Sequence, residues 1–297
     1  MSRTQANLLL LLAGAVWGMG FVAQSTAMAF IGPFLFIGMR FLAATFAMLP
    51  FALLESARAS VPLGRNRWRA FILIGLMLFG AIAFQQLGIL STTVTNSGFL
   101  TGLYVVLTPI CGVLLFRDMP HIAVWTAALI AVAGIWLLAG GQLSALTKGD
   151  WLSILGALFC GFQLSLIGRH AASTGRPVTM AVTQFAVCAA LGLALAVVLE
   201  PIDLAAIREA APQILYAGIF SGGIAFTLQA IGQRYTTAAQ AAVFLSSEAV
   251  FAALFGAWFL GERLPAIGWL GCVLILIAIL VAEAVPAMRR RTAAAIP

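Results

Sequence analysis

Apolar runs about as long as a bilayer is thick follow one another along the whole of this chain. A helix needs about 20 predominantly apolar residues to cross the hydrocarbon core of a membrane. Only 8% of the residues are charged, whereas about a quarter are charged in a soluble domain. The sequence therefore predicts an all-α integral membrane protein and excludes a water-soluble enzyme, a disordered chain and a secreted disulfide scaffold. We place ten transmembrane helices near residues 7–30, 34–55, 69–90, 94–116, 122–141, 151–170, 178–199, 212–233, 237–260 and 266–285.

The first apolar run has a second interpretation. Residues 27–29, Ala-Met-Ala, resemble a signal-peptidase site that follows an apolar stretch. The run over 8–30 is longer than the core of a signal peptide and contains Trp17 and Gln24. We therefore interpret it as the first membrane-spanning helix.

The basic residues predict how the helices are oriented. With ten spans, twelve of the 16 Lys and Arg residues fall in segments on the side of the N-terminus, three fall on the other side, and Arg40 lies within a helix. Cytoplasmic loops carry an excess of such residues, so we expect both termini in the cytoplasm and the chain in a bacterial plasma (inner) membrane. The bases sit at the ends of apolar runs and line no single face, which argues against nucleic-acid binding.

Groups that carry enzymatic chemistry are scarce in this sequence. The single lysine, Lys148, is followed by Gly and Asp and not by the Ser or Thr of a phosphate-binding loop. No aspartate lies in an apolar run, and the two histidines fall at predicted helix ends. The four cysteines lie in apolar runs without Cys-x-x-Cys spacing, which is typical of small buried hydrophobic residues. We expect no catalytic residue, no metal and no cofactor.

The two halves of the chain resemble each other at an offset of 142 to 145 residues. Residues 14–17 match 156–159, Pro33 matches Pro177, residues 80–84 match 222–226, Asp118 matches Glu262, and Trp125 matches Trp269. We therefore divide the chain into two repeats, 1–145 and 146–297, each with five predicted helices. Because five is odd, the second repeat enters the membrane from the opposite side. Inverted repeats are typical of secondary transporters, whose substrate site lies near the midplane between the repeats.

Four segments carry a pattern that points to a family. They are Gly14–Gly18, Met39–Ala43, Ser247–Gly256 and Leu260–Leu264. These segments resemble EamA-type carriers of the drug/metabolite transporter superfamily, and the resemblance covers nearly the whole chain. It implies a secondary transporter for small metabolites, favours export, and implies a fold in which the fifth helix of each repeat lies away from the cavity. The family often has Pro where this chain has Ala249, so we expect a weaker helix break there.

Polar residues concentrate in the third, fourth, eighth and ninth predicted helices and are nearly absent from the fifth and tenth. Intramembrane polar groups mark either a transport pathway or hydrogen bonds between helices, and both explanations are open for the Ser and Thr residues. We expect the fifth and tenth helices to face lipid or the partner of a homodimer, while the others enclose a cavity. The expected substrate-binding residues are Trp17, Gln85, Gln86, Thr101, Tyr104, Gln163, Thr227, Gln229 and Ser247.

Two charged residues lie deep within the predicted helices, away from their ends. Glu248 is the one carboxylate deep in an apolar run, and Arg40 is a cation in another. An unpaired charge at such a depth is costly, so we expect an Arg40–Glu248 ion pair that bridges the repeats. Two roles are open: a structural pair, or a Glu248 that binds a proton or the cationic group of a substrate. Gln184 occupies the position that the repeat makes equivalent to Arg40 and is a further polar candidate.

Three residues are candidates for hinges. Pro109 removes a backbone hydrogen bond from the fourth helix, and Gly222 and Gly223 permit bending or close packing in the eighth. We expect them to serve rocking of the repeats around a central site.

Together these features predict a secondary active transporter that moves a small organic metabolite by alternating access. The neutral amides, hydroxyls and aromatic rings favour an amino acid-like, aromatic or amphipathic solute. Uptake of a vitamin-like metabolite is an alternative. Two alternatives belong to different classes: a non-transporting membrane scaffold and a lipid-modifying enzyme. The enzyme would require clustered His, Asp or Lys residues that the sequence lacks.

Overall fold

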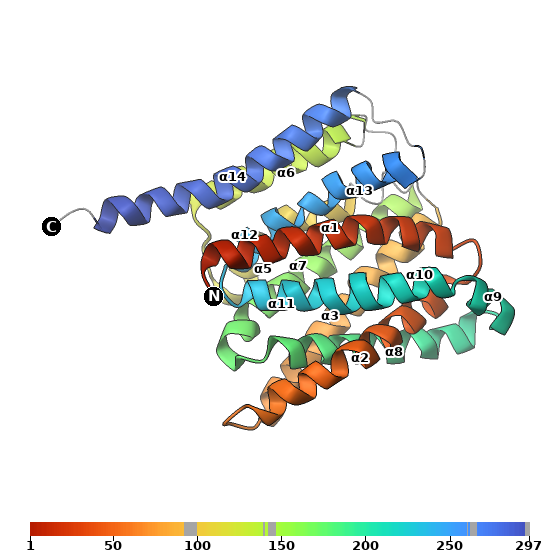
Figure 1. Ribbon diagram of the computed structural model, residues 1–297. Helices are drawn as coiled ribbons and strands as arrows, with labels where there is room; N and C mark the ends of the chain where they lie inside the picture. The colour runs from red at the N-terminus through yellow and green to blue at the C-terminus, as the bar shows by residue number, and fades with distance from the viewer. Residues whose placement is uncertain (92–99, 139, 142–146, 260, 262–265, 295–297) are drawn as a thin grey trace.

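The computed structural model describes residues 1–91, 100–138, 140–141, 147–259, 261 and 266–294, with side chains described up to residue 282. Within these ranges the chain forms helices and no strand (Figure 1). The helices are α1 (Arg3–Ala27), α2 (Pro33–Ala57), α3 (Arg65–Ile89), α5 (Tyr104–Phe116), α6 (Ile122–Leu138), α7 (Lys148–Thr174), α8 (Pro177–Leu199), α9 (Leu204–Glu209), α10 (Ala211–Leu215), η1 (Tyr216–Ala225), α11 (Phe226–Gln233), α12 (Ala238–Leu245), α13 (Ser247–Phe259) and α14 (Ala266–Ala294).

The membrane-spanning segments agree with the ten that the apolar runs predict. Seven helices are long and apolar enough to cross a membrane, and three shorter apolar helices bring the described residues to ten segments. The shorter ones are Leu100–Phe116, Ile122–Leu138 and Ala266–Ala282. α10, η1 and α11 form the single span Ala211–Gln233, and α12 with α13 forms Ala238–Phe259. The start of the predicted helix 94–116 lies outside the described residues.

Most helix ends differ from the prediction by a few residues, while α14 continues to Ala294, beyond its predicted end at 285. The third helix begins at Arg65, four residues before its predicted start at 69. Arginine side chains at the end of a span can keep the charged head in the polar interface while the stem lies along apolar surface. The helix therefore includes basic residues that an apolar run excludes.

Helices α2 and α8 pack along each other at the contact between the repeats. Gly38 and Gly192 allow their backbones to approach closely, because a Cβ atom on Gly192 would lie 2.6 Å from the amide nitrogen of Gly38. Each helix begins with a proline in its first turn, Pro33 in α2 and Pro177 in α8. A proline is favourable there because its missing N–H needs no partner.

The end of each of these helices caps the beginning of the other. The Glu55 carboxylate accepts hydrogen bonds from the N–H groups of Val178 and Thr179 at 3.1 and 2.7 Å. The Glu200 carboxylate accepts bonds from the N–H groups of residues 34–35, both at 2.8 Å. The first N–H groups of a helix have no partner within it, and a carboxylate is favoured there by the helix dipole. The repeats are therefore joined at both ends of the α2–α8 pair.

Helices α6 and α14 lie side by side at the edge of the bundle (Figure 1). Gly134 and Gly271 lie at their contact, where a Cβ atom on Gly134 would be 2.8 Å from the Gly271 carbonyl oxygen. Outward-facing apolar side chains such as Leu129 and Leu276 are exposed. This arrangement matches the expectation that the fifth helix of each repeat lies away from the cavity. The homodimer through these helices stays a prediction.

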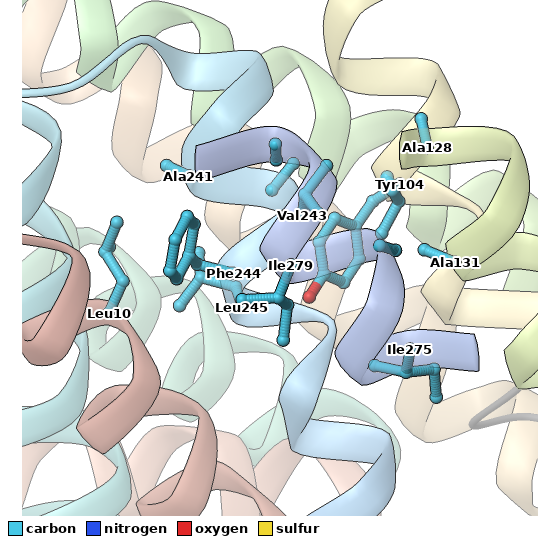
Figure 2. Packing of buried hydrophobic residues seen from close by; sticks show 14 of the residues in the cluster. Leu10, Tyr104, Ala128, Ala131, Ala241, Val243, Phe244, Leu245, Ile275 and Ile279 are labelled. Atoms are coloured by element: carbon cyan, nitrogen blue, oxygen red, sulfur yellow. The ribbon is translucent and has the colours of Figure 1, made fainter. Parts of the chain in front are cut away.

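A buried apolar cluster connects α1, α5, α6, α12 and α14. Figure 2 shows Tyr104 among side chains of this cluster, with Val243 of α12, Ala131 of α6 and Ile279 of α14 close by. Tyr104 is only 2% exposed. Its ring is therefore part of the core, and the packing fixes where its hydroxyl group lies.

Basic side chains bind neighbouring helices at one end of the bundle. Arg3 donates a hydrogen bond from Nη2 to the Oε1 atom of Gln240, and Arg176 donates from Nη2 to the carbonyl oxygen of Val61. Figure 1 places both termini toward this end. Which membrane face this end occupies stays a prediction from the charge distribution.

Candidate functional site

A pocket lies between the two repeats. Its walls come from α1, α2, α3, α7, η1, α11 and α13 and from the segment Leu100–Phe116. The predicted residues that line it are Trp17, Arg40, Gln85, Thr101, Tyr104, Gln163, Gln229 and Glu248. Its lining thus combines one cation, one carboxylate, several neutral amides and aromatic rings.

A chain of hydrogen bonds runs from Arg40 along the wall of the first repeat, and we call it the first glutamine network. Arg40 donates from Nη1 to Oε1 of Gln24 at 2.9 Å. Gln24 donates from Nε2 to Oε1 of Gln85 at 3.5 Å, and Gln85 donates from Nε2 to Oγ1 of Thr101 at 3.3 Å. The Nε atom of Arg40 is buried and has no hydrogen-bond partner.

A second glutamine network begins at the pocket wall of the second repeat, where Gln163 and Gln229 line the pocket. Gln229 donates from Nε2 to Oε1 of Gln163 at 3.3 Å, and Gln163 donates from Nε2 to Oε1 of Gln184 at 2.9 Å. Gln184 donates from Nε2 to the carbonyl oxygen of Met180 at 3.3 Å. The Oε1 atom of Gln229 is buried and has no hydrogen-bond partner.

Arg40 and Glu248 line the same pocket, but the structure gives no ion pair between these two described residues. The guanidinium group instead binds Gln24 and lies over aromatic rings, 4.6 Å from the ring centre of Phe41 and 5.5 Å from that of Phe36. Such rings attract a cation electrostatically, so Arg40 is stabilised on its own wall of the pocket. The expected pair is therefore not formed in this conformation.

Trp17 connects the two repeats at the pocket wall. Its Nε1 atom donates a hydrogen bond to the carbonyl oxygen of Ser221 at 3.0 Å. Its ring lies 4.6 Å from the Phe226 ring with an angle of 56° between the planes. The side chain lines the pocket as expected, with its N–H group already bound to η1.

Three predicted binding residues are buried outside the pocket lining: Gln86, Thr227 and Ser247. Each lies one or two positions from a residue that does line the pocket. One residue turns an α-helix by about 100°, so these side chains leave the pocket face and enter contacts between helices. Ser247, for example, packs against Gly14 of α1, where a Cβ atom would collide with its hydroxyl group.

The interruption of the fourth predicted helix lies earlier than Pro109. Helix α5 continues through Pro109, and the irregular residue is Leu103, whose carbonyl oxygen accepts a three-residue hydrogen bond from the N–H group of Val106 at 3.0 Å. The adjacent Gly102 packs closely on Ile135 of α6, which only a residue without a side chain allows. A hinge at Pro109 stays a prediction, while the irregular backbone of this segment lies at Leu103.

The ninth predicted helix has a matching interruption. Ser246 separates α12 from α13, and its carbonyl oxygen accepts a bond from the N–H group of Ala249 at 3.1 Å. Leu103 and Ser246 are related by an offset of 143 residues, close to the repeat offset. Tyr104 and Glu248 follow these two interruptions, so both half-helices begin at the pocket.

The eighth predicted helix is irregular where Gly222 and Gly223 lie. The residues Tyr216–Ala225 form the π-helix η1, whereas the equivalent part of α3 is a regular α-helix. Single-turn π-bulges occur frequently at functional sites, and this stretch is longer. A hinge at these glycines stays a prediction, now with a local irregularity that supports it.

Sequence reasoning missed several lining residues, among them Gln24, Ser221 and Phe226. Gln24 is an amide inside the first apolar run, so its polarity was a usable signal. Ser221 and Phe226 carried none, because a small hydroxyl and an aromatic ring are ordinary contents of a packed helix.

Comparison with known proteins agrees with this architecture. The model of the EamA-like transporter family matches residues 4–140 and 147–283. The chain belongs to the EamA-like transporter family. It is therefore a membrane transporter built from two EamA repeats, and not an enzyme. The family match supports two repeats, while the division at 145 and 146 stays a prediction.

Two relatives share most of this EamA-like chain. An uncharacterized transporter of Archaeoglobus fulgidus is 32% identical over 282 residues, which cover 94% of this chain and 86% of the relative. The uncharacterized transporter YwfM of Bacillus subtilis is 28% identical over 302 residues, which cover 97% of this chain and 97% of the relative. A crystal structure at 21% identity has a TM-score of 0.77 and covers 95% of this chain and 98% of its own, which shows the shared fold.

Proposed function

We propose that this EamA-like transporter is a secondary active carrier that exports a small organic metabolite by alternating access across the cytoplasmic membrane. The solute is amino acid-like, with an aromatic or amphipathic side chain. One observation supports this most: Arg40 and Glu248 line one pocket without pairing with each other.

A cation and a carboxylate that line one pocket without pairing favour a ligand that carries a negative and a positive group. Charged groups at membrane depth need partners. An anionic group of the solute binds near Arg40, and an ammonium group binds near Glu248, so one zwitterion neutralises both. Trp17, Phe21 and Phe226 supply apolar lining for the rest of the solute.

Between the pocket and the basic end of the bundle, hydrogen bonds join α7 to α11 and to α5. On that side, Gln233 donates from Nε2 to the carbonyl oxygen of Leu164 at 2.9 Å. Ser165 donates from Oγ to the carbonyl oxygen of Thr108 at 3.0 Å. If the basic end is cytoplasmic, as the charge distribution indicates, these bonds hold α7 to α5 and α11 on the cytoplasmic side of the site. Loading from the cytoplasm then requires α7 to move away from α5 and α11.

Proton coupling is part of the proposal and assigns a role to Glu248. A carboxylate at the pocket can hold either a proton or the ammonium group of the solute, and competition between the two couples their movements. Export is then driven by protons that enter the cell down their gradient as the solute leaves. Uptake of a vitamin-like solute uses the same site with the opposite direction of net flux.

Counterflow with the purified full-length chain in liposomes tests the proposal. Vesicles are loaded with one unlabelled compound from a panel of amino acids, aromatic amines and vitamins, and uptake of the labelled compound is measured. We expect exchange with zwitterionic aromatic compounds, and we expect Glu248→Gln to weaken it. A protein that exchanges none of the panel contradicts the proposed solute class, and one that exchanges only compounds without an ammonium group contradicts the role of Glu248.

A further inference from the structure

Each glutamine network ends at a residue that lines the pocket, and the unpartnered atoms of these two residues have opposite hydrogen-bonding character. The buried group without a partner in the first network is Nε of Arg40, which can only donate. In the second network it is Oε1 of Gln229, which can only accept. Both residues line the pocket. Buried polar groups without partners are rare in proteins and call for an explanation.

The direction of the first network is fixed where it begins. A guanidinium group has donors and no acceptor, so Gln24 must turn its Oε1 atom toward Arg40. The Nε2 atom of Gln24 then faces Gln85, which must accept with Oε1. Gln85 is left to donate to Thr101. The amide orientations therefore follow from the charge of Arg40.

The direction of the second network is fixed at its far end. A main-chain carbonyl accepts and cannot donate, so Gln184 must turn Nε2 toward Met180. Its Oε1 atom is then left to accept from Gln163. Gln163 in turn accepts from Gln229. The oxygen of Gln229 is the atom that remains, because a reversed Gln229 amide would place its oxygen against the oxygen of Gln163.

The two networks are anchored at equivalent positions of the repeats. Arg40 and Gln184 are separated by 144 residues, which is within the offset that relates the repeats. One repeat has a pure donor there, and the other has an amide held by a carbonyl oxygen. The difference at this single position accounts for the opposite directions.

We propose that Gln184 and Gln163 are positioning residues that hold the oxygen of Gln229 toward the pocket and thereby fix the orientation of the transported solute. The inference rests on the proposed function, since it takes the pocket as the substrate site. The anionic end of the solute binds the wall of the first repeat at Arg40. Its ammonium end binds the wall of the second repeat, at Gln229 and Glu248.

Three probes that differ only in their charged groups test this orientation. L-phenylalanine carries a carboxylate and an ammonium group, 3-phenylpropionate carries only the carboxylate, and 2-phenylethylamine carries only the ammonium group. Binding of each to the solubilised full-length chain is measured by calorimetry. We expect the wild-type chain to bind L-phenylalanine most tightly.

Variants in the two networks are expected to change the affinity for some of the probes and not for others. Gln184→Met removes the anchor and has a similar side-chain volume. It should lower the affinity for L-phenylalanine and 2-phenylethylamine by about five- to tenfold, the effect of one good hydrogen bond. The affinity for 3-phenylpropionate should change by less than twofold. Gln24→Met should instead lower the affinity for the two probes that carry a carboxylate, L-phenylalanine and 3-phenylpropionate. Gln184→Glu, which still accepts from Gln163, should retain more ammonium binding than Gln184→Met.

Gln86→Met is the matched control, because Gln86 is a buried glutamine outside the pocket lining and outside both networks. It should leave the relative affinities of the three probes unchanged. Equal weakening of all three probes by Gln184→Met, or no weakening, overturns the proposed orientation while the transporter assignment stands. If Gln184→Met does not fold, Gln184→Glu decides: loss of ammonium binding equal to loss of carboxylate binding overturns the inference. A wild-type chain that binds none of the probes contradicts the proposed solute class, and the inference with it.

Discussion

The indole Nε1 of Trp17 donates to the main-chain oxygen of Ser221 at 3.0 Å, so a side chain of the first repeat binds the π-helix of the second. At the end of that π-helix the N–H group of Phe226 donates to the carbonyl oxygen of Gly223. Trp17 thus supports a backbone stretch that departs from the regular α-helix of the equivalent α3.

Trp17→Phe should slow transport by about two- to tenfold, because it removes one hydrogen bond while it keeps an aromatic ring at the pocket. Hydrogen exchange at the amides of η1 should accelerate in the same variant. The control is Ser221→Ala, which leaves the accepting oxygen in place because that oxygen belongs to the main chain. Identical behaviour of the two variants would show that the bond has no role in transport.

Glu248→Gln should remove the response of transport to a proton gradient. The amide resembles a protonated carboxyl group and cannot release a proton, so the site stays in one protonation form. In liposomes with an imposed pH difference, the wild-type chain should accumulate solute against its gradient, and the variant should only equilibrate it. Asp203→Asn, at an exposed residue next to α9, serves as the control. Accumulation that persists in Glu248→Gln would assign proton binding to another group.

Glu55→Gln and Glu200→Gln should each destabilise the protein by about 0.5–2 kcal/mol, the usual range for a lost helix cap. Each carboxylate accepts two main-chain N–H groups at the start of the facing helix, and an amide offers one acceptor oxygen without the charge. Thermal unfolding in detergent measures the effect. Glu209→Gln, on an exposed face of α9, should leave the melting temperature unchanged. A control that loses as much stability as the cap variants would remove capping as the explanation.

Cysteine labelling should place Val61 and Asp203 on opposite faces of the membrane. Val61 lies at the end of the bundle with the basic residues, bound to Arg176, and Asp203 precedes α9 at the other end. In cells, a membrane-impermeant maleimide should label Asp203→Cys directly and Val61→Cys only after permeabilisation, in a background where the four native cysteines are replaced. Labelling of both in intact cells contradicts the ten-span arrangement, and the reversed pattern contradicts the cytoplasmic termini.

The membrane-spanning helices could be predicted from the sequence because the signal is physical and local. A run of apolar residues must form a helix in lipid, since its backbone groups find no other partner there. The repeat was equally accessible, because Pro33 and Pro177 begin matching helices. Most of the polar residues predicted for the pocket line it, because a polar group at that depth needs either a cavity or a hydrogen-bond partner.

The sequence could not predict which side of each helix faces the pocket, or which partner each polar side chain binds. Gln85 lines the pocket and Gln86 does not, and their order in the sequence contains no such information. The expected ion pair failed for a similar reason: Arg40 found Gln24 and the ring of Phe41 nearer to its own helix. The π-helix had no recognisable pattern beyond its glycines, so the Trp17–Ser221 bond could not be foreseen.

The exchange of carboxylates between α2 and α8 bears on how such a protein arose. In an ancestor with five helices, two identical copies inserted in opposite orientations would have formed both caps with one and the same glutamate. In a fused chain, positions 40 and 184 can carry different residues, because each exists only once per molecule. In the present chain, Glu55 of the first half binds N–H groups of the second half, and Glu200 of the second half binds N–H groups of the first. Separately expressed halves should therefore need each other in the membrane.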